Sequence, residues 1–513
     1  MYAERGLIAG NAQLNPKIRV LTELRPALGG HAGIPQAARL LFSSLCRLDS
    51  LEVEGLIQSS RLPLMRGLPG RASARHKPLP PDQEIHRLGR VVISLERETA
   101  DYHIRATAGT IAMLFKHVCG GQQRLTHFPA SRFRDFVWRR FFERTLPSDD
   151  IEAVTSADFR IARVPWGAMH IAALVTRKLG WCVYPRLDTS GFDVMISETP
   201  YPGTVASNTQ LIVRYHDAIP LLMPHTISDR RWHQAFHYHA LRKNVVSGAW
   251  FVCVSEATRA DLLTIFPQLE DRSVTIPNMV SHEYFEEDSS AARVPEIIKT
   301  HLSAELNPPL DPRVKRALFA ALPPPPRIPS EYLLIVSTLE PRKNHLNLVA
   351  AWERLRIERS SHLKLIVVGA LGWHHEPIIG QLRPWLERGE AFLLADVPAS
   401  ELRVLYRHAA ATICPSFSEG FGFSGVEAMK SGGAVVASDL PVHREIYRDA
   451  AEFFNPYDIG DVVRGICAVI DPFQAARRSE LTIRGAAVAA LYDRAVIAPK
   501  WDALLHALTR ATK

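Results

Sequence analysis

The sequence predicts an α/β protein built from two doubly wound parallel sheets. Short apolar runs typical of buried parallel strands alternate with segments of helical periodicity along most of the chain. At 513 residues the chain is long enough for at least two domains with full cores. Acidic, polar and proline-rich sequence over residues 286–330 separates the alternation into two blocks, which indicates an extended linker between two domains.

Composition indicates an ordinary globular protein, and the net charge indicates which partners it favours. A hydrophobic content of 47% and a charged content of 22% are ordinary for a globular protein. The net charge of +8 suits a phosphorylated substrate, and it also fits a peripheral contact with an anionic membrane. A nucleic-acid partner is not expected, because neither a long basic run nor a nucleic-acid motif occurs.

Cysteine usage and the N-terminal sequence favour a cytoplasmic setting. The six cysteines are scattered and form no Cys-x-x-Cys pair, so neither a disulfide framework nor a zinc knuckle is indicated. The N-terminus lacks the layout of a signal peptide, and no apolar stretch approaches the roughly 18 residues of a membrane span.

The first block opens with a strand over 18–22, followed by Gly29, Gly30 and Gly33. A helix then begins with Pro35 in its first turn, where a proline's missing N–H costs nothing. A strand, a glycine loop and a helix in this order suit a phosphate, although a plain tight turn explains any single glycine equally well.

The middle of the first block is less regular. Residues 58–90 are rich in arginine, proline and glycine and are predicted to form a loop, followed by a strand over 90–95 and a helix over 107–118. Residues 132–144 predict a helix in which aromatics and arginines interleave. Such a helix fits an anionic lipid surface, but we favour an ordinary helix with its aromatics in the core.

Two buried strands are predicted over 192–197 and 210–215, and the second leads into His216. Ligands of parallel sheets gather beyond the carboxyl ends of strands, so His216 is a candidate functional residue. A helical segment that carries His233, His237 and His239 has metal-like spacing, but no carboxylate partner follows and no metal is expected. Further on, Ser255 is predicted to cap a helix over 256–265, after a strand over 250–254.

The second block repeats the alternation. Strands are predicted over 332–336, 363–369, 392–397 and 434–438, a helix over 399–408, and a helical tail from residue 479. The pair Arg342 and Lys343 follows the first of these strands. It is either a solvated surface pair or a cationic site beside a bound anion.

One stretch of the second block carries most of the chemistry. A strand over 410–414 leads through Gly420, Gly422 and Gly425 into a helix over 424–430, with Glu419 before the glycines and Glu427 inside the helix. A glycine turn that opens a helix directs unpaired N–H groups and the positive end of the helix dipole at one point, which suits a phosphate. The same pattern also occurs in plain strand-to-helix turns.

Four stretches together resemble the retaining nucleotide-sugar glycosyltransferases of the large family four, which adopt the two-domain GT-B fold. The resemblance covers residues 208–461, is weak before them, and keeps the family's order along the chain. The stretches are Val213–Leu221, Val252–Leu262, Val336–Asn344 and Pro415–Met429. One departure is that many members carry Gly-Arg where this chain has Ser337-Thr338, which shifts the expected diphosphate contacts to Arg342 and Lys343.

The resemblance implies a role for each candidate residue. His216 and Glu419 would lie beside the donor sugar as catalytic residues, Glu427 would bind the ribose, and the backbone near Val397 would meet the base. The glycine turn, with Arg342 and Lys343, would hold the diphosphate, and the loop of Gly29, Gly30 and Gly33 would lie on the cleft floor. The implied contacts of the turn and the start of its helix come from Gly420, Phe421, Gly422, Phe423 and Ser424.

The expected division of the chain follows from these assignments. Residues 17–285 would form an acceptor domain with insertions around 58–180, residues 286–330 the linker, and residues 331–480 the nucleotide-sugar domain. Residues 481–513 would form a helical tail that crosses back to the first domain.

The expected activity is retaining transfer of a mannose-like hexose, without a metal or other cofactor. GDP-mannose is the first donor, and a glycan or lipid-linked glycan of surface polysaccharide assembly is the acceptor. Two alternatives remain, a GT-B nucleotide-sugar epimerase or hydrolase and a non-catalytic nucleotide-sugar-binding scaffold. Consumption of donor without acceptor separates the first from a transferase, and binding without turnover identifies the second.

Overall fold

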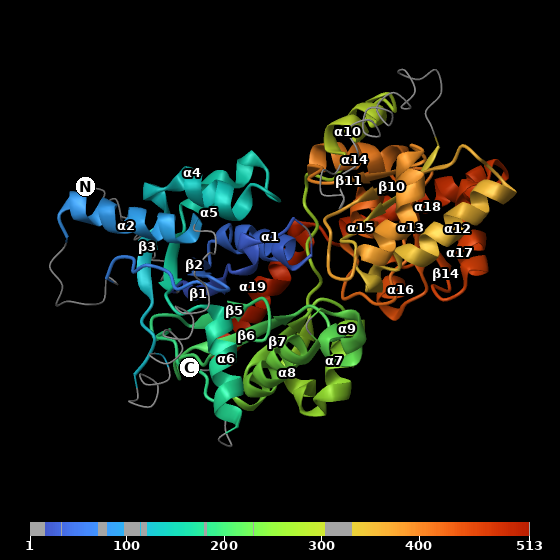
Figure 1. The fold of residues 1–513 in the computed structure, drawn as a ribbon. Helices are drawn as coiled ribbons and strands as arrows, with labels where there is room; N and C mark the ends of the chain where they lie inside the picture. The colour runs from blue at the N-terminus through green and yellow to red at the C-terminus, as the bar shows by residue number, and fades with distance from the viewer. Residues whose placement is uncertain are drawn as a thin grey trace, which may run out of the picture.

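The computed structural model describes residues 16–31, 33–69, 79–96, 113, 121–178, 182–228, 230–302 and 331–511. Two sheets, each flanked by helices, form two domains that lie side by side in Figure 1. The α/β class with two doubly wound sheets is therefore confirmed. The predicted helix over 107–118, apart from residue 113, and the four consecutive prolines of the linker lie outside the described residues.

The N-terminal sheet has eight strands in the order β3-β4-β2-β1-β5-β6-β7-β8, and every pair except β3–β4 is parallel. Non-consecutive neighbours such as β1 and β5 are the result of crossover connections. The strands are β1 Ile18–Glu23, β2 Leu51–Gln58, β3 Thr126–Pro129, β4 Asp158–Ala162, β5 Val194–Ser197, β6 Gln210–Tyr215, β7 Trp250–Cys253 and β8 Ser273–Thr275.

The helices of this domain include α1, which follows the glycine loop and buries an apolar face that contains Leu41, Phe42 and Leu45. The predicted cap of α9 is confirmed, because Ser255 Oγ accepts from Thr258 N at 3.1 Å. The helices are α1 Ile34–Cys46, α2 Pro81–Glu96, α4 Arg134–Val137, α5 Ile151–Thr155, α6 Trp166–Arg177, α7 Ile219–Leu222, α8 Arg230–Val246 and α9 Glu256–Ile265.

The C-terminal sheet has six strands, all parallel, in the order β11-β10-β9-β12-β13-β14. The strands are β9 Tyr332–Val336, β10 Lys364–Val368, β11 Ala391–Leu394, β12 Ala411–Cys414, β13 Val435–Ser438 and β14 Ala451–Phe454. The helices are α10 Arg293–His301, α12 His345–Glu358, α13 Glu376–Glu387, α14 Ala399–His408, α15 Phe423–Lys430, α16 Pro441–Tyr447, α17 Ile459–Ile470 and α18 Ala475–Ala490.

The last helix, α19 Arg494–Ala511, returns to the N-terminal domain, as predicted for the tail (Figure 1). Ile497, Trp501 and Leu505 are fully buried in the core that also holds β1 and α1. At its start, Arg494 Nη2 lies 2.9 Å from the buried carboxylate of Asp150, so the tail is fixed by packing and by charge.

Three local predictions differ from the structure. Residues 90–95 are helical rather than extended, because α2 starts at Pro81 within the predicted loop and buries Leu88, Val91 and Leu95 at helical spacing. The segment predicted as an extended linker contains α10, whose Val294, Ile297 and Ile298 pack into the C-terminal core.

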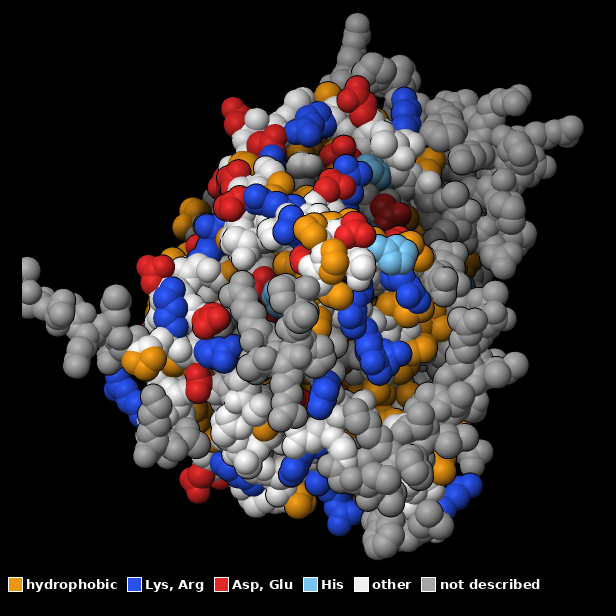
Figure 2. All heavy atoms as spheres, turned by 90° about the vertical axis from the view of Figure 1, so that its left-hand side faces the viewer, with side chains coloured by type: hydrophobic (Ala, Val, Ile, Leu, Met, Phe, Trp, Pro, Cys, Tyr) orange, Lys and Arg blue, Asp and Glu red, His pale blue; other side chains and the backbone are white. Residues whose placement is uncertain are grey.

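The predicted basic helix over 132–144 is the third difference. It is interrupted: α4 ends at Val137 and a π-helical turn covers Trp138–Phe142. Phe141 and Phe142 are buried in the domain core, which supports the interpretation with inward aromatics. Figure 2, which views the molecule from the left-hand side of Figure 1, shows Lys and Arg side chains scattered among acidic and apolar ones.

The described residues contain neither a disulfide nor a membrane-spanning helix. The five described cysteines are all free. Within the same ranges no helix combines the length and the apolar character needed to cross a membrane.

Candidate functional site at the domain boundary

The glycine turn joins β12 to α15 at the carboxyl edge of the C-terminal sheet. Gly422 is the N-cap of α15 and has φ +86°, a conformation that glycine adopts without strain. A Cβ on Gly425 would lie 2.4 Å from the ring of Tyr447, so the helix packs closely on α16. The turn therefore needs its glycines for backbone conformation and for close approach.

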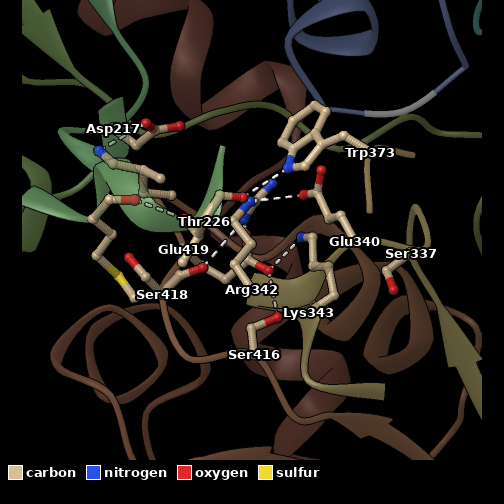
Figure 3. Close-up of polar contacts among 12 residues, drawn as sticks. Asp217, Thr226, Ser337, Glu340, Arg342, Lys343, Trp373, Ser416, Ser418 and Glu419 are labelled. Carbon is tan, nitrogen blue, oxygen red and sulfur yellow. Dashed lines mark hydrogen bonds and ion pairs between the residues drawn. The ribbon is translucent and has the colours of Figure 1, made fainter. Parts of the chain in front are cut away.

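Glu419, just before the turn, lies in a cluster of charges that Figure 3 shows. Its carboxylate pairs with Lys343 and with Arg342, whose Nη1 lies at 3.1 Å, and it accepts from Ser416 Oγ at 2.6 Å. Glu340 contacts Arg342 Nε at 2.7 Å from the other side. The structure thus brings the adjacent pair Arg342 and Lys343 together with Glu419, which lies more than 70 residues further along the chain.

The protonation of Glu419 follows from these neighbours. Burial raises the pKa of its carboxyl, but Lys343 and Arg342 lower it by more, and the net pKa lies well below the usual range. The side chains of Arg342 and Lys343 remain 18% and 16% exposed, so both cations stay accessible to a ligand.

Glu427 lies in α15, apart from this cluster. One carboxylate oxygen accepts from Gln36 Nε2 of α1 at 2.8 Å, and the other accepts from Tyr406 O–H at 3.1 Å. Burial raises the pKa of Glu427, and these hydrogen bonds partly offset it. The bond to Gln36 links the two domains.

His216, directly after β6, belongs to a buried triad. Its Nε2 lies 3.0 Å from Glu198, and Glu198 also pairs with Arg214 at 3.2 Å. Burial lowers the pKa of His216, although the bond to Glu198 acts in the opposite direction. The imidazole therefore bonds to a carboxylate of its own domain, and we find no contact of the ring with Glu419 or Glu427 among the described hydrogen bonds and ion pairs.

The backbone of His216, rather than its ring, touches the glycine turn. A Cβ on Gly420 would lie 1.7 Å from the His216 carbonyl oxygen, which leaves no room for any other residue. The Gly420 carbonyl in turn accepts from Ser255 Oγ at 2.8 Å. At the rim, Trp373 Nε1 donates to Thr226 O at 2.7 Å across the same boundary (Figure 3).

The loop of Gly29, Gly30 and Gly33 lies between β1 and α1. Gly30 and Gly33 have φ values of +57° and +71°. The buried guanidinium of Arg39 donates to the Gly29 and Gly30 carbonyls at 3.1 and 3.0 Å and so fixes the loop. Arg39 was not singled out from the sequence, because it belongs to no recognisable motif. Its position within the apolar face of a predicted helix was the one available sign of a buried charge.

The remaining candidate residues occupy different settings. Val397 is half-buried beyond β11, next to Asp396, whose φ is +53°. Phe421 packs its ring into the domain core against Phe423, so its contribution to a ligand is limited to its backbone. Ser424 Oγ lies 3.7 Å from Cys414 Sγ.

The histidines with metal-like spacing have other contacts. His237 Nε2 lies 3.3 Å from the Tyr215 hydroxyl, and burial lowers its pKa to about 3. In the described part of the chain, no group of three or more His, Cys, Asp or Glu side chains is arranged to hold a metal ion.

Solved structures place this architecture in the GT-B class. The chain aligns with sucrose-phosphate synthase from Thermosynechococcus elongatus with a TM-score of 0.55 and 14% identity, over 96% of this chain and 100% of the other. It aligns with an alpha,alpha-trehalose-phosphate synthase (UDP-forming) from Burkholderia vietnamiensis with a TM-score of 0.51 and 12% identity, over 96% and 99%. Two parallel α/β domains and a tail helix that crosses back are thus the GT-B fold.

The sequence comparisons agree with this fold. Residues 324–478, which include most of the C-terminal domain, match the family described as "Glycosyl transferases group 1". It is similar to O-antigen chain mannosyltransferase B of Escherichia coli, with 28% identity over 43% of this chain and 51% of the relative. It is also similar to serotype-specific mannosyltransferase WbdA of Escherichia coli, with 32% identity over 39% and 25%. The matches thus span about half or less of these relatives.

Four residues that surround the predicted site residues were not singled out from the sequence. Glu198 and Arg214 complete the His216 triad, Glu340 balances Arg342, and Gln36 reaches Glu427. Glu198 and Glu340 each follow the end of a strand, the position that also marked His216, so the same rule could have found them.

Proposed function

We propose that the protein is a retaining glycosyltransferase that moves a hexose from a nucleotide-diphosphate sugar to a glycan or lipid-linked glycan acceptor. The observation that carries this proposal is the cationic pair Arg342 and Lys343 beside the helix-opening glycine turn, inside the segment that matches the family. A diphosphate that leaves with negative charge needs this kind of fixed positive group.

The donor would be held mainly by the C-terminal domain. The N–H groups at the start of α15, from Gly422 to Ser424, would bind phosphate oxygens, and Arg342 and Lys343 would neutralise the diphosphate. Glu419 and Glu340 already balance these two cations, so a bound diphosphate would share or replace the contact between Lys343 and Glu419.

Glu427 and Glu419 would contact different sugars of the donor. Glu427 would accept from the ribose hydroxyls in exchange for its bond to Gln36, and the backbone near Val397 would meet the base. Glu419 would lie beside the hexose. The loop of Gly29, Gly30 and Gly33, fixed by Arg39, would form the floor of the cleft.

His216 would orient the hexose. Glu198 accepts from Nε2–H, so the proton lies on Nε2 and Nδ1 is left as an acceptor for a sugar hydroxyl. Transfer with retention would occur by attack on the same face, with the leaving phosphate oxygen taking the acceptor's proton. His216 would support this step by holding the sugar, not by attacking it.

GDP-mannose is the first donor to test, because the relatives named above are mannosyltransferases. The acceptor would be a growing surface glycan at the cytoplasmic face of a membrane, where the net positive charge favours an anionic lipid surface.

The test measures thermal stabilisation by a panel of nucleotide sugars, then nucleotide release with and without a lipid-linked glycan acceptor. A transferase releases nucleotide in an acceptor-dependent way and keeps the configuration of the anomeric carbon. Equal release without acceptor would instead identify a hydrolase or epimerase, and binding without release a scaffold.

A further inference from the structure

A buried imidazole that the proposed function does not use lies beside the glycine turn. His443 is 1% exposed and belongs to α16, which follows β13, the neighbour of β12 in the sheet. Its ring stacks on Tyr447 with centroids 4.9 Å apart, and the Tyr447 hydroxyl donates to Gly422 O at 2.8 Å. The ring is therefore held against the turn that carries the proposed phosphate site.

The orientation of the ring follows from two contacts. His443 Nδ1 lies 2.9 Å from the Ser438 carbonyl oxygen, and a carbonyl only accepts, so Nδ1 carries the proton. A Cβ on Gly422 would lie 3.4 Å from His443 Cδ2, the carbon bonded to Nε2. The edge with Cδ2 and Nε2 therefore faces the turn.

His443 Nε2 is a buried polar atom with no hydrogen-bond partner among the described residues. The hydroxyl of Ser438, in the same connection, is likewise buried and unpartnered within the described part of the chain. Buried polar atoms are nearly always hydrogen-bonded, so two unpaired ones at the same connection indicate a site for a ligand.

The chemistry of Nε2 selects the kind of ligand group. Burial lowers the pKa of His443, although nearby Glu419 raises it, and the ring is neutral with a lone pair on Nε2. A lone pair cannot bond to a phosphate oxygen, which also accepts. It can accept from a hydroxyl group.

Neighbouring charges decide which hydroxyl this is. The Cδ2 edge of the ring faces Gly422, which follows Glu419 by three residues in the same turn, and Glu419 and Lys343 both act on the pKa of His443. Glu427, which we assign to the ribose, instead contacts Gln36 and Tyr406. The ring thus lies at the hexose end of the proposed donor site.

We propose that His443 accepts a hydrogen bond at Nε2 from one hydroxyl of the donor hexose and so helps to determine which sugar is used. This inference rests on the proposed function, because it assigns a residue to the same donor site. Discrimination of this kind is strong, since a donor that lacks the hydroxyl leaves a buried acceptor unpaired.

Two substitutions separate this role from a structural one. His443→Asn keeps a donor at the position of Nδ1, which can still bond to Ser438 O, but has no atom at Nε2. His443→Gln places an amide oxygen near Nε2 and gives up the Nδ1 position. If Nε2 accepts from a donor hydroxyl, His443→Gln should be tolerated better than His443→Asn. If the bond from Nδ1 to Ser438 O matters instead, the order should be reversed.

The experiment measures kcat/KM for the donor that the wild type uses and the affinity for the matching nucleoside diphosphate. We expect His443→Asn to lower kcat/KM by roughly 10- to 100-fold and His443→Gln by less than about 5-fold, with unchanged nucleoside diphosphate affinity in both. Wild-type kcat/KM in His443→Asn would overturn the assignment. A loss of nucleoside diphosphate affinity as large as the loss of kcat/KM would overturn it too.

A second measurement uses the wild type and His443→Asn, and its wild-type part can be carried out even if the variant does not fold. In a series of deoxy-sugar donors, one missing hydroxyl should cost at least about 10-fold in kcat/KM, and that cost should vanish in His443→Asn. A series in which every hydroxyl is dispensable contradicts the inference while leaving transferase activity intact. Failure of the wild type to bind any nucleotide sugar contradicts the proposed function itself, and this inference with it.

Discussion

Each domain brings one cluster of charged side chains to the boundary, and the two clusters differ in burial. Arg214, Glu198 and His216 are 0%, 0% and 9% exposed. Arg342 and Lys343 retain 18% and 16% exposure around Glu419. A sealed cluster keeps the partners it has, whereas a cluster at a rim can exchange them for a ligand. On the function proposed above, the N-terminal cluster would fix an imidazole and the C-terminal cluster would receive an anion.

Glu198→Ala tests the sealed cluster and should have the largest effect. It leaves the Arg214 guanidinium buried without its carboxylate, which costs about 3–5 kcal/mol of unfolding free energy. Urea unfolding followed by tryptophan fluorescence measures the loss. A change of less than about 1 kcal/mol would mean that the triad is hydrated and that the contrast between the clusters is wrong.

Gly420→Ala tests whether the two clusters must meet. Its Cβ would overlap the His216 carbonyl at 1.7 Å, so the domains could not close in this arrangement, and turnover should fall at least about 100-fold. Gly380→Ala in α13 is the matched control, because nothing lies within 4 Å of a Cβ there. Both variants should unfold near the wild-type temperature. A Gly420→Ala protein with wild-type turnover would contradict the claim that the two domains must meet at this glycine.

Lys343→Met tests the exchangeable cluster. Loss of one cation should weaken nucleoside diphosphate binding by roughly 10-fold, as measured by calorimetry, because charge-assisted bonds to phosphate are strong. The unfolding free energy should change by only about 0–1 kcal/mol, as for other partly exposed ion pairs. A large loss of stability with unchanged affinity would reverse the assignment of the two clusters.

The pH dependence of stability gives the smallest effect. The pKa of Glu419 is lower in the folded than in the unfolded protein, so its ion pairs stabilise the fold above the free value of 4.5, and this stabilisation is lost as the pH falls through the folded pKa. In Glu419→Gln the slope of unfolding free energy in acid should be smaller by at most about 1.4 kcal/mol per pH unit. Identical slopes in the two proteins would show that Glu419 is not paired in solution.

The sequence predicts the repeating parts of this molecule well. Apolar strands, the glycine turn and the capping Ser255 each follow from local patterns, and five of the six strands of the C-terminal sheet lie where they were predicted, β14 being the exception. The helix α2 was missed because Val91, Val92 and Ile93 look like a strand when they are taken without Leu88, which lies one turn earlier. The helical spacing of apolar residues shows only when it is followed over more than one turn.

The partners within the site were harder to predict. Arg342 and Glu419 were both singled out, but their pairing depends on two loops that meet only in the folded sheet. The Glu198 contact to His216 likewise joins the ends of two adjacent strands, β5 and β6. Such contacts are set by topology rather than by spacing along the chain, so single-sequence patterns do not contain them.

The returning helix α19 has a consequence for biosynthesis. Trp501 and Leu505 fill the core around β1, so the N-terminal domain cannot complete its interior until α19, some 480 residues further along the chain, has been translated. Until then an apolar groove would be exposed in the nascent polypeptide.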